Sequence, residues 1–292
     1  MEKALKAQSS IKDYILLTKP GIIMGNLVTA VGGFALAGRA LFDLALFIGM
    51  LEGLALVIGA ACIFNNIIDR NHDAKMERTK YRALARGVIS VRSAGLFGTL
   101  LLLSGAFILG VATNFLTMLV ALIGVFFYVV VYSLSKYQTS YGTLIGTIAG
   151  SIPPVVGYVA VTGRFDLGAL LIFLIVAMWQ MPHFFAIAIY RLSDYAKASI
   201  PVFPIAHGMH KTKVHMTLYL SLFIGACATL TLTGYTTTLF MIIMGAVGAL
   251  WLFVAIKGFK AKNDLVWGRK MFIFSLVVIM VLSLIIPFTT VV

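Results

Sequence analysis

Apolar segments long enough to cross a lipid bilayer recur through almost the whole chain, and they restrict the folds open to it. A helix needs about 20 mainly apolar residues to span a bilayer. We count nine such segments, at approximately residues 15–37, 42–68, 94–113, 115–134, 140–162, 166–190, 214–233, 236–256 and 269–289. Only 11% of the 292 residues are charged and 61% are hydrophobic, which leaves little sequence for a soluble domain. The sequence therefore predicts an all-α polytopic membrane protein, a bundle of about nine transmembrane helices forming one domain over residues 1–292.

The net charge of +13 follows from topology and does not indicate nucleic-acid binding. Basic residues concentrate in the cytoplasmic loops of membrane proteins. With a cytoplasmic N-terminus and nine spans, all of the 23 Lys and Arg residues except Arg39 and Arg164 fall on the cytoplasmic side. This asymmetry predicts the orientation, supports the count of nine spans and places the C-terminus outside. It excludes nucleic acid as a partner. The expected location is the cell (inner) membrane, which the chain would cross several times.

Two loops on the predicted cytoplasmic face, residues 69–92 and 191–213, carry the polar motifs. Asn65, Asp69 and Asp73, where the second span ends and the first loop begins, are spaced four residues apart. On a helix this step turns about 40° and rises about 6 Å, so the three side chains share one face. Carboxylates at a helix C-terminus are disfavoured by the helix dipole. Their oxygens predict a bound cation, and hard oxygen ligands favour Mg²⁺.

Asp194 in the second loop is the fourth expected metal ligand. A single Asp at a membrane interface is ordinarily a solvated side chain. Here the two loops follow even-numbered spans and can meet at one mouth of the bundle, so we expect Asp194 to share the cation site.

Basic residues interleave with the first acidic motif, which suits a diphosphate that binds both Mg²⁺ and cationic side chains. Topology alone explains some of these bases. The residues expected to bind the diphosphate are Arg70, Lys75, Arg78, Arg82 and, from the end of the fourth span, Lys136. Tyr132 lies one turn before Lys136 on the same face. Asp69, Asp73, Lys136 and Tyr132 are the expected catalytic residues. A diphosphate at the mouth of an apolar bundle indicates a prenyl diphosphate, with its tail in the membrane.

Residues 179–183, Trp-Gln-Met-Pro-His, form a second unusual string. His183 lies about seven residues, or about 10 Å, inside the sixth span. Ionisable residues at that depth are costly and are generally functional. Two interpretations are open: a neutral His bonded to a neighbouring helix, or a contact for a bound cofactor. Glu52 lies about 20 Å along its helix from Asn65, which is too far to share the cation site.

The fifth span carries a stripe of small residues, Gly142, Gly146 and Gly150. Small residues at this spacing allow a neighbouring helix to approach closely.

Together these strings resemble the intramembrane prenyltransferases of the UbiA superfamily. The first acidic motif, with Arg78-Thr79 and Arg82 after it, resembles the superfamily in general. Four other strings resemble its heme-farnesylating branch: residues 17–20, 141–146 with 153–158, 179–183, and 194–204. The resemblance covers approximately residues 12–287. Quinone-forming members usually have an Asp where this chain has Ala198. Ala83, Ser199 and residues 202–203 also depart from the branch, without affecting an expected ligand.

The resemblance implies transfer of a farnesyl group from farnesyl diphosphate to a vinyl group of heme b, with addition of water, to give heme O. It implies Mg²⁺ on the diphosphate, heme b as substrate, and contacts from His183 and Trp179 to the heme. A heme A synthase or a heme–copper terminal oxidase is an implied partner, with membrane lipid as the surroundings.

Three alternatives differ from this prediction. A quinone-type aromatic prenyltransferase would keep the acidic motif but is disfavoured by Ala198. A secondary transporter would place its sites near the bilayer midplane, whereas both acidic loops are predicted to face the cytoplasm. A non-catalytic heme-binding assembly factor would need His183 but not the acidic motif.

Overall fold

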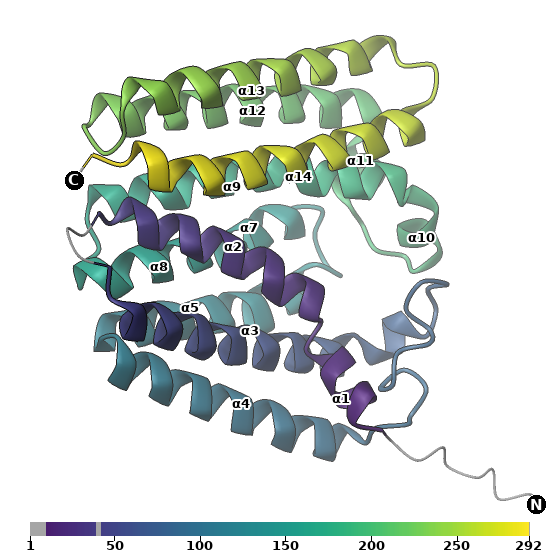
Figure 1. Cartoon of the computed structure of the whole chain (residues 1–292). Helices are drawn as coiled ribbons and strands as arrows, with labels where there is room; N and C mark the ends of the chain where they lie inside the picture. The colour runs from purple at the N-terminus through teal and green to yellow at the C-terminus, as the bar shows by residue number, and fades with distance from the viewer. Residues whose placement is uncertain (1–9, 39–41, 292) are drawn as a thin grey trace, which may run out of the picture.

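The protein is a bundle of long, roughly parallel and antiparallel helices, in a computed structural model that describes residues 10–38 and 42–291 (Figure 1). Six spans are unbroken helices: α3 (Leu44–Asp73), α4 (Val91–Ala112), α9 (Leu167–Tyr190), α12 (Met209–Leu232), α13 (Thr238–Lys257) and α14 (Asp264–Thr289). Two are built of consecutive pieces: α5 (Phe115–Phe126), the π-helix η1 (Phe127–Tyr132) and α6 (Ser133–Ser135), then α7 (Gly142–Gly150) and α8 (Ile152–Thr162). One more is formed by α1 (Ile11–Leu17) and α2 (Pro20–Leu36), which are bent by 47°.

These spans confirm the predicted all-α membrane fold. Within the described residues, eight helices are long and apolar enough to cross a membrane, or nine if the bent pair is one span. The turns at residues 113–114 and 233–237 separate the two pairs of spans that only short polar stretches divide in the sequence. The multi-pass character of the chain follows directly.

Polar residues in the short breaks start the helices by capping them. A side-chain oxygen that accepts a hydrogen bond from a backbone N–H replaces a partner missing in the first turn. Such caps are formed by Asp43 at α3, Ser90 at α4, Asn114 at α5, Asp166 at α9 and Asn263 at α14. Few polar residues between apolar segments are therefore enough to define where each span begins.

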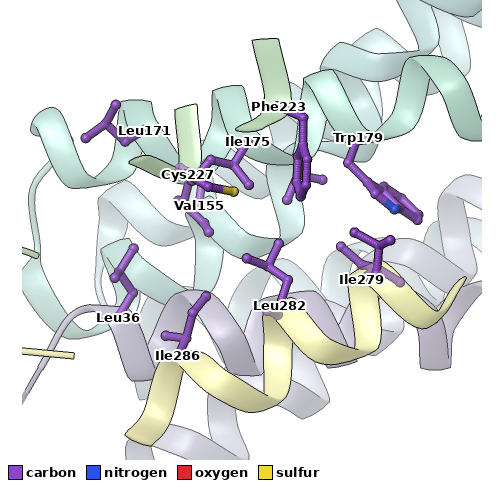
Figure 2. Close-up of a cluster of buried hydrophobic side chains, with 14 of the residues drawn as sticks. Leu36, Val155, Leu171, Ile175, Trp179, Phe223, Cys227, Ile279, Leu282 and Ile286 are labelled. Atoms are coloured by element: carbon purple, nitrogen blue, oxygen red, sulfur yellow. The ribbon is translucent and has the colours of Figure 1, made fainter. Parts of the chain in front are cut away.

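The spans pack in a fixed order across the bundle. The pair α3 and α4 lies at one side, α12 and α13 lie at the other, and α2, α8, α9 and α14 lie between them (Figure 1). Leu36, Val155, Ile175 and Ile286 join these central helices in one buried cluster (Figure 2). The core therefore sits where α9 meets α2, α8, α12 and α14.

The outward surface is apolar as well, as expected of a protein surrounded by lipid. On α4, Leu96, Leu100, Leu103, Phe107 and Val111 recur at steps of three or four residues and are exposed. This periodicity gives α4 one continuous apolar outer face. Glu52 on α3 is also exposed and is directed away from the interior.

The two predicted loops are partly helical. Helix α3 continues to Asp73, so the first acidic motif lies on the last turns of a helix and the loop begins only after it. In the second loop, α10 (Leu192–Lys197) and α11 (Phe203–His207) form short helices, and α12 begins at Met209. The predicted loops 69–92 and 191–213 therefore include helical residues: the last turn of α3, the first residues of α4 and α12, and all of α10 and α11. A 3₁₀ turn, η2 (Gly258–Lys260), follows α13.

We expect α2 and α8 to tolerate no side chain where they cross. A Cβ atom on Gly33 would lie 1.8 Å from the carbonyl oxygen of Pro154. Gly33→Ala should therefore separate the two helices and cost about 1–3 kcal/mol of stability, as overpacking generally does. The measurement is the melting temperature of the purified protein in detergent.

Gly245→Ala on α13 is the matched control, because nothing lies within 4 Å of its added Cβ. An equal decrease in melting temperature for both variants would contradict the close α2–α8 contact.

Candidate active site

The carboxylates of α3 point into the bundle. Asn65, Asp69 and Asp73 are only 2%, 7% and 5% exposed. Their four-residue spacing aligns them along one face of the helix, as predicted from the sequence. Isolated charges are strongly disfavoured in such surroundings unless they are paired. The partners that neighbouring elements supply therefore define this site.

Asp69 is held by two residues that follow η1 and α6. The Lys136 Nζ atom lies 2.5 Å from Asp69 Oδ2, and the Tyr137 hydroxyl donates a hydrogen bond of 2.7 Å to Asp69 Oδ1. The Tyr137 ring stacks on His72 with centroids 3.8 Å apart. Two donors thus approach the carboxylate from a chain segment nearly 70 residues away.

Asp73, the last residue of α3, is paired with the loop that follows this helix. Arg82 Nη1 lies 2.7 Å from Asp73 Oδ2 and donates a second, longer hydrogen bond of 3.3 Å to Asn66 Oδ1. The Thr79 hydroxyl donates to the backbone carbonyl of Asp73 at 3.0 Å. The loop after α3 therefore folds back over the end of its own helix.

The Lys19 ammonium donates a hydrogen bond of 2.8 Å to Asn65 Oδ1. Lys19 stands at the bend between α1 and α2 with a positive φ of 54°, and Pro20 begins α2. Asn65 in turn donates to the Ser133 hydroxyl at 2.9 Å. Lys19 is thus a site residue for which the sequence predicted no role, although a Lys before Pro near the start of the first apolar span was a usable signal.

The glycine stripe of α7 permits this arrangement. A Cβ on Gly142 would lie 2.8 Å from the Lys136 Cα atom, and one on Gly146 would lie 3.0 Å from the Tyr132 ring. Tyr132 belongs to η1, and π-helical turns frequently mark functional sites. Lys136 Nζ lies 5.2 Å from the centroid of the Tyr132 ring, within cation–π range. The small residues predicted to allow close approach therefore bring Tyr132 and Lys136 to the site.

A single cavity of about 710 Å³ gathers most of the predicted residues. The predicted residues that line it are Asn65, Asp69, Asp73, Arg78, Arg82, Tyr132, Lys136, Trp179, His183 and Asp194. Lys19, Tyr128 and Tyr137 line it in addition. Arg70 and Lys75 are absent from this lining. Arg70 donates to the backbone carbonyl of Ile67, and Lys75 is exposed.

Asp194 faces the cavity from α10 and stands apart from the acids of α3. Its nearest charged partner is Arg191, at 3.8 Å. Among residues 10–38 and 42–291, no group of three or more His, Cys, Asp or Glu side chains is arranged to hold a metal ion. In this structure the two loops share one cavity without sharing a cluster of carboxylates.

The donor set on α3 nevertheless fits a hard cation. It consists of the two carboxylates and one carboxamide oxygen, which suit Mg²⁺. Each of these oxygens is held here by a Lys or Arg side chain. The same cationic groups lie inside the cavity, where they can transfer to an anion that arrives with a metal ion. The residues present are therefore consistent with a metal–diphosphate ligand.

Burial shifts the pKa values of two residues after α6. It lowers the pKa of Lys136, and the neighbouring Asp69 carboxylate opposes that shift. It raises the pKa of Tyr137, and the hydrogen bond to Asp69 raises it further. Tyr137 thus remains a neutral hydrogen-bond donor to Asp69.

Helices α9 and α14 form another part of the cavity wall. His183 and Trp179 stack on one another with ring centroids 4.8 Å apart. His183 Nδ1 lies 2.7 Å from the Ser275 hydroxyl oxygen. Gln180 donates to the buried Ser151 hydroxyl at 3.0 Å. The cavity wall thus combines the charged residues of α3 with the stacked rings of α9.

The fold and this cavity define a polytopic membrane protein with a charged site enclosed among its helices. The model of the UbiA prenyltransferase family matches residues 26–277. Because this match covers most of the sequence, the chain belongs to the UbiA prenyltransferase family.

Curated relatives and solved structures agree with that assignment. The chain is 48% identical over 274 residues to a protoheme IX farnesyltransferase of Yersinia pseudotuberculosis, covering 94% of this chain and 93% of the relative. It is 48% identical over 278 residues to one of Protochlamydia amoebophila, covering 95% and 98%.

Two solved structures share the fold at low sequence identity. A digeranylgeranylglyceryl phosphate synthase superposes with a TM-score of 0.79 at 17% identity, covering 95% of this chain and 97% of that one. A UbiA homologue from Archaeoglobus fulgidus bound to GPP and Mg²⁺ superposes with a TM-score of 0.71 at 16% identity, covering 94% and 99%. The arrangement of helices is thus common to the family.

We expect Tyr137→Phe to destabilise the protein by about 1–3 kcal/mol, because a buried carboxylate loses a donor while the ring stacking is kept. The melting temperature in detergent, with no ligand added, measures the effect. Tyr141→Phe is the control, since Tyr141 is exposed. Equal stability of Tyr137→Phe and the unaltered protein would show that the bond to Asp69 contributes nothing.

Proposed function

We propose that the chain transfers the farnesyl group of farnesyl diphosphate to a vinyl group of heme b, with addition of water, to give heme O and diphosphate. One observation carries the proposal: a single cavity joins the charged residues of α3 to the aromatic pair on α9. The relatives named protoheme IX farnesyltransferase, at 48% identity over nearly the whole chain, support this choice of substrates.

Asn65, Asp69 and Asp73 would hold Mg²⁺, which neutralises charge on a bound diphosphate. In the proposed complex, Lys19, Arg82 and Lys136 turn from the α3 oxygens towards the diphosphate. Arg78 and Asp194 complete the ring of charge at the mouth. Cationic groups placed at the leaving oxygen favour its departure, because negative charge develops there as the bond breaks.

The apolar part of the cavity protects the reactive prenyl group. Leu54, Val57, Ala121 and Ile152 line the cavity away from the charged residues. The farnesyl C1–oxygen bond breaks, and the terminal vinyl carbon of the heme forms a bond to C1. Water then adds to the remaining vinyl carbon and releases a proton. Excluding bulk water until that point prevents hydrolysis of the allylic cation.

His183 and Trp179 are proposed to receive the heme. A flat, stacked pair of rings at the cavity wall suits a porphyrin. The imidazole would face the heme iron, and the basic residues at the mouth would also pair with the heme propionates.

The proposed setting is the cell inner membrane, with the N-terminus and the cavity mouth on the cytoplasmic side. The distribution of Lys and Arg supports this orientation. One domain over residues 1–292 would carry the whole activity. A heme A synthase or a heme–copper terminal oxidase would use its product. The curated relatives do not favour a quinone-type aromatic prenyltransferase.

We expect the purified protein, given heme b, farnesyl diphosphate and Mg²⁺, to form heme O, identified by mass spectrometry. Asp73→Ala should lower the rate by about a hundredfold or more, because the leaving group loses its electrostatic support. Glu77→Ala, in the same loop but outside the cavity lining, should retain the rate. Full activity of Asp73→Ala, or no heme O from the unaltered protein, would refute the proposal.

We also expect Lys19 to bind the diphosphate. Lys19→Met should raise the KM for farnesyl diphosphate by about tenfold or more, as loss of a charged hydrogen bond generally does. Lys12→Met, an exposed position on α1, should leave KM unchanged. Steady-state kinetics decide between these outcomes, and equal KM values for both variants would remove Lys19 from the site.

A further inference from the structure

Helix α14 meets the aromatic pair of α9 at one residue, Ser275. This serine is fully buried. Its backbone carbonyl accepts a hydrogen bond of 2.9 Å from Trp179 Nε1. Its hydroxyl oxygen lies 2.7 Å from His183 Nδ1. One residue therefore contacts both of these cavity-lining rings, and Trp179 lies beside α14 in Figure 2.

The hydroxyl of Ser275 donates its proton to a backbone carbonyl of its own helix. The hydroxyl oxygen also lies 2.5 Å from the backbone carbonyl oxygen of Phe272. A carbonyl can only accept, so the serine proton must lie on this bond. The serine oxygen then acts as acceptor toward His183, and the proton between them belongs to Nδ1. In a neutral imidazole the other nitrogen, Nε2, consequently carries the lone pair.

The lone pair of Nε2 is available to a ligand. No hydrogen bond from residues 10–38 or 42–291 reaches this atom, and His183 lines the cavity. The His183 imidazole contacts Trp179, and the centroid of the Phe272 ring lies 5.2 Å from its own. These two rings restrict rotation of the imidazole. The ring is thus held with its donor side toward α14, which leaves the basic nitrogen unused by the protein.

We propose that Ser275 is a positioning residue for heme: its hydroxyl selects the His183 tautomer whose Nε2 can bind the heme iron. This rests on the proposed function. It goes further by assigning a role on α14, a helix to which neither acidic motif belongs. Partners that hold the second nitrogen of a ligating His generally alter metal affinity by about 10–100-fold when removed.

The test is a titration of the purified, full-length protein with heme b, followed by absorption spectroscopy, without farnesyl diphosphate. We expect Ser275→Ala to weaken heme binding about tenfold and to shift the Soret band. Ser275→Cys has nearly the same volume but only a weak sulfur acceptor, so it should show the same loss of heme binding as Ser275→Ala. Ser275→Thr keeps the hydroxyl and should retain the spectrum of the unaltered protein. Melting temperatures are recorded for all variants, so a folding defect in one leaves the other two to decide.

Ser283→Ala is the matched control, since Ser283 is a buried serine two turns further along α14, beside Gly32 of α2. It should leave the heme spectrum unchanged. Equal losses in Ser275→Ala and Ser283→Ala would overturn the inference, because general packing of α14 would then explain both.

His183→Ala separates the inference from the proposed function. If His183→Ala loses the heme spectrum while Ser275→Ala and Ser275→Cys keep it, Ser275 has no positioning role and the proposed function stands. If His183→Ala binds heme like the unaltered protein, the heme contact in the proposed function is wrong, and the inference fails with it. Loss of heme O formation with an intact heme spectrum in His183→Ala would also overturn the inference.

Discussion

The pairing of buried carboxylates with cations inside an apolar bundle is the interaction on which the site depends. Asp69 and Asp73 lie on the last turns of α3, where the helix dipole disfavours them. Lys136 and Arg82 offset this unfavourable placement by direct contact. Because each cation comes from a different segment, the charge pairs tie the end of α3 both to the chain after α6 and to its own loop.

The same pairing explains why the site can serve a charged ligand. Charges that only neutralised one another could be replaced by well-packed apolar groups at little loss of stability. Here the paired charges line a cavity. If the carboxylates bind a metal ion, the basic side chains still line the same cavity. The cavity thus contains both carboxylates that can bind a metal ion and basic side chains that can bind an anion.

Much of the fold was predictable from the sequence because lipid imposes a simple requirement. Each span must satisfy its backbone hydrogen bonds internally and expose apolar side chains, so the number of spans and their limits follow from the lengths of the apolar runs. The short helices α10 and α11 inside the second predicted loop were not predicted. Asp73 lies on the helical face predicted from its spacing, but the local apolar pattern carries no information about its pairing with Arg82.

The sequence by itself determined the membrane-spanning helices and the shared face of Asn65, Asp69 and Asp73, because both follow from periodicity along one helix. Only the tertiary structure decided which distant groups meet that face. Lys19 and Tyr137 reach it through a bend before α2 and a turn after α6. Such contacts depend on how helices pack against one another, and sequence spacing within a single helix does not record that packing.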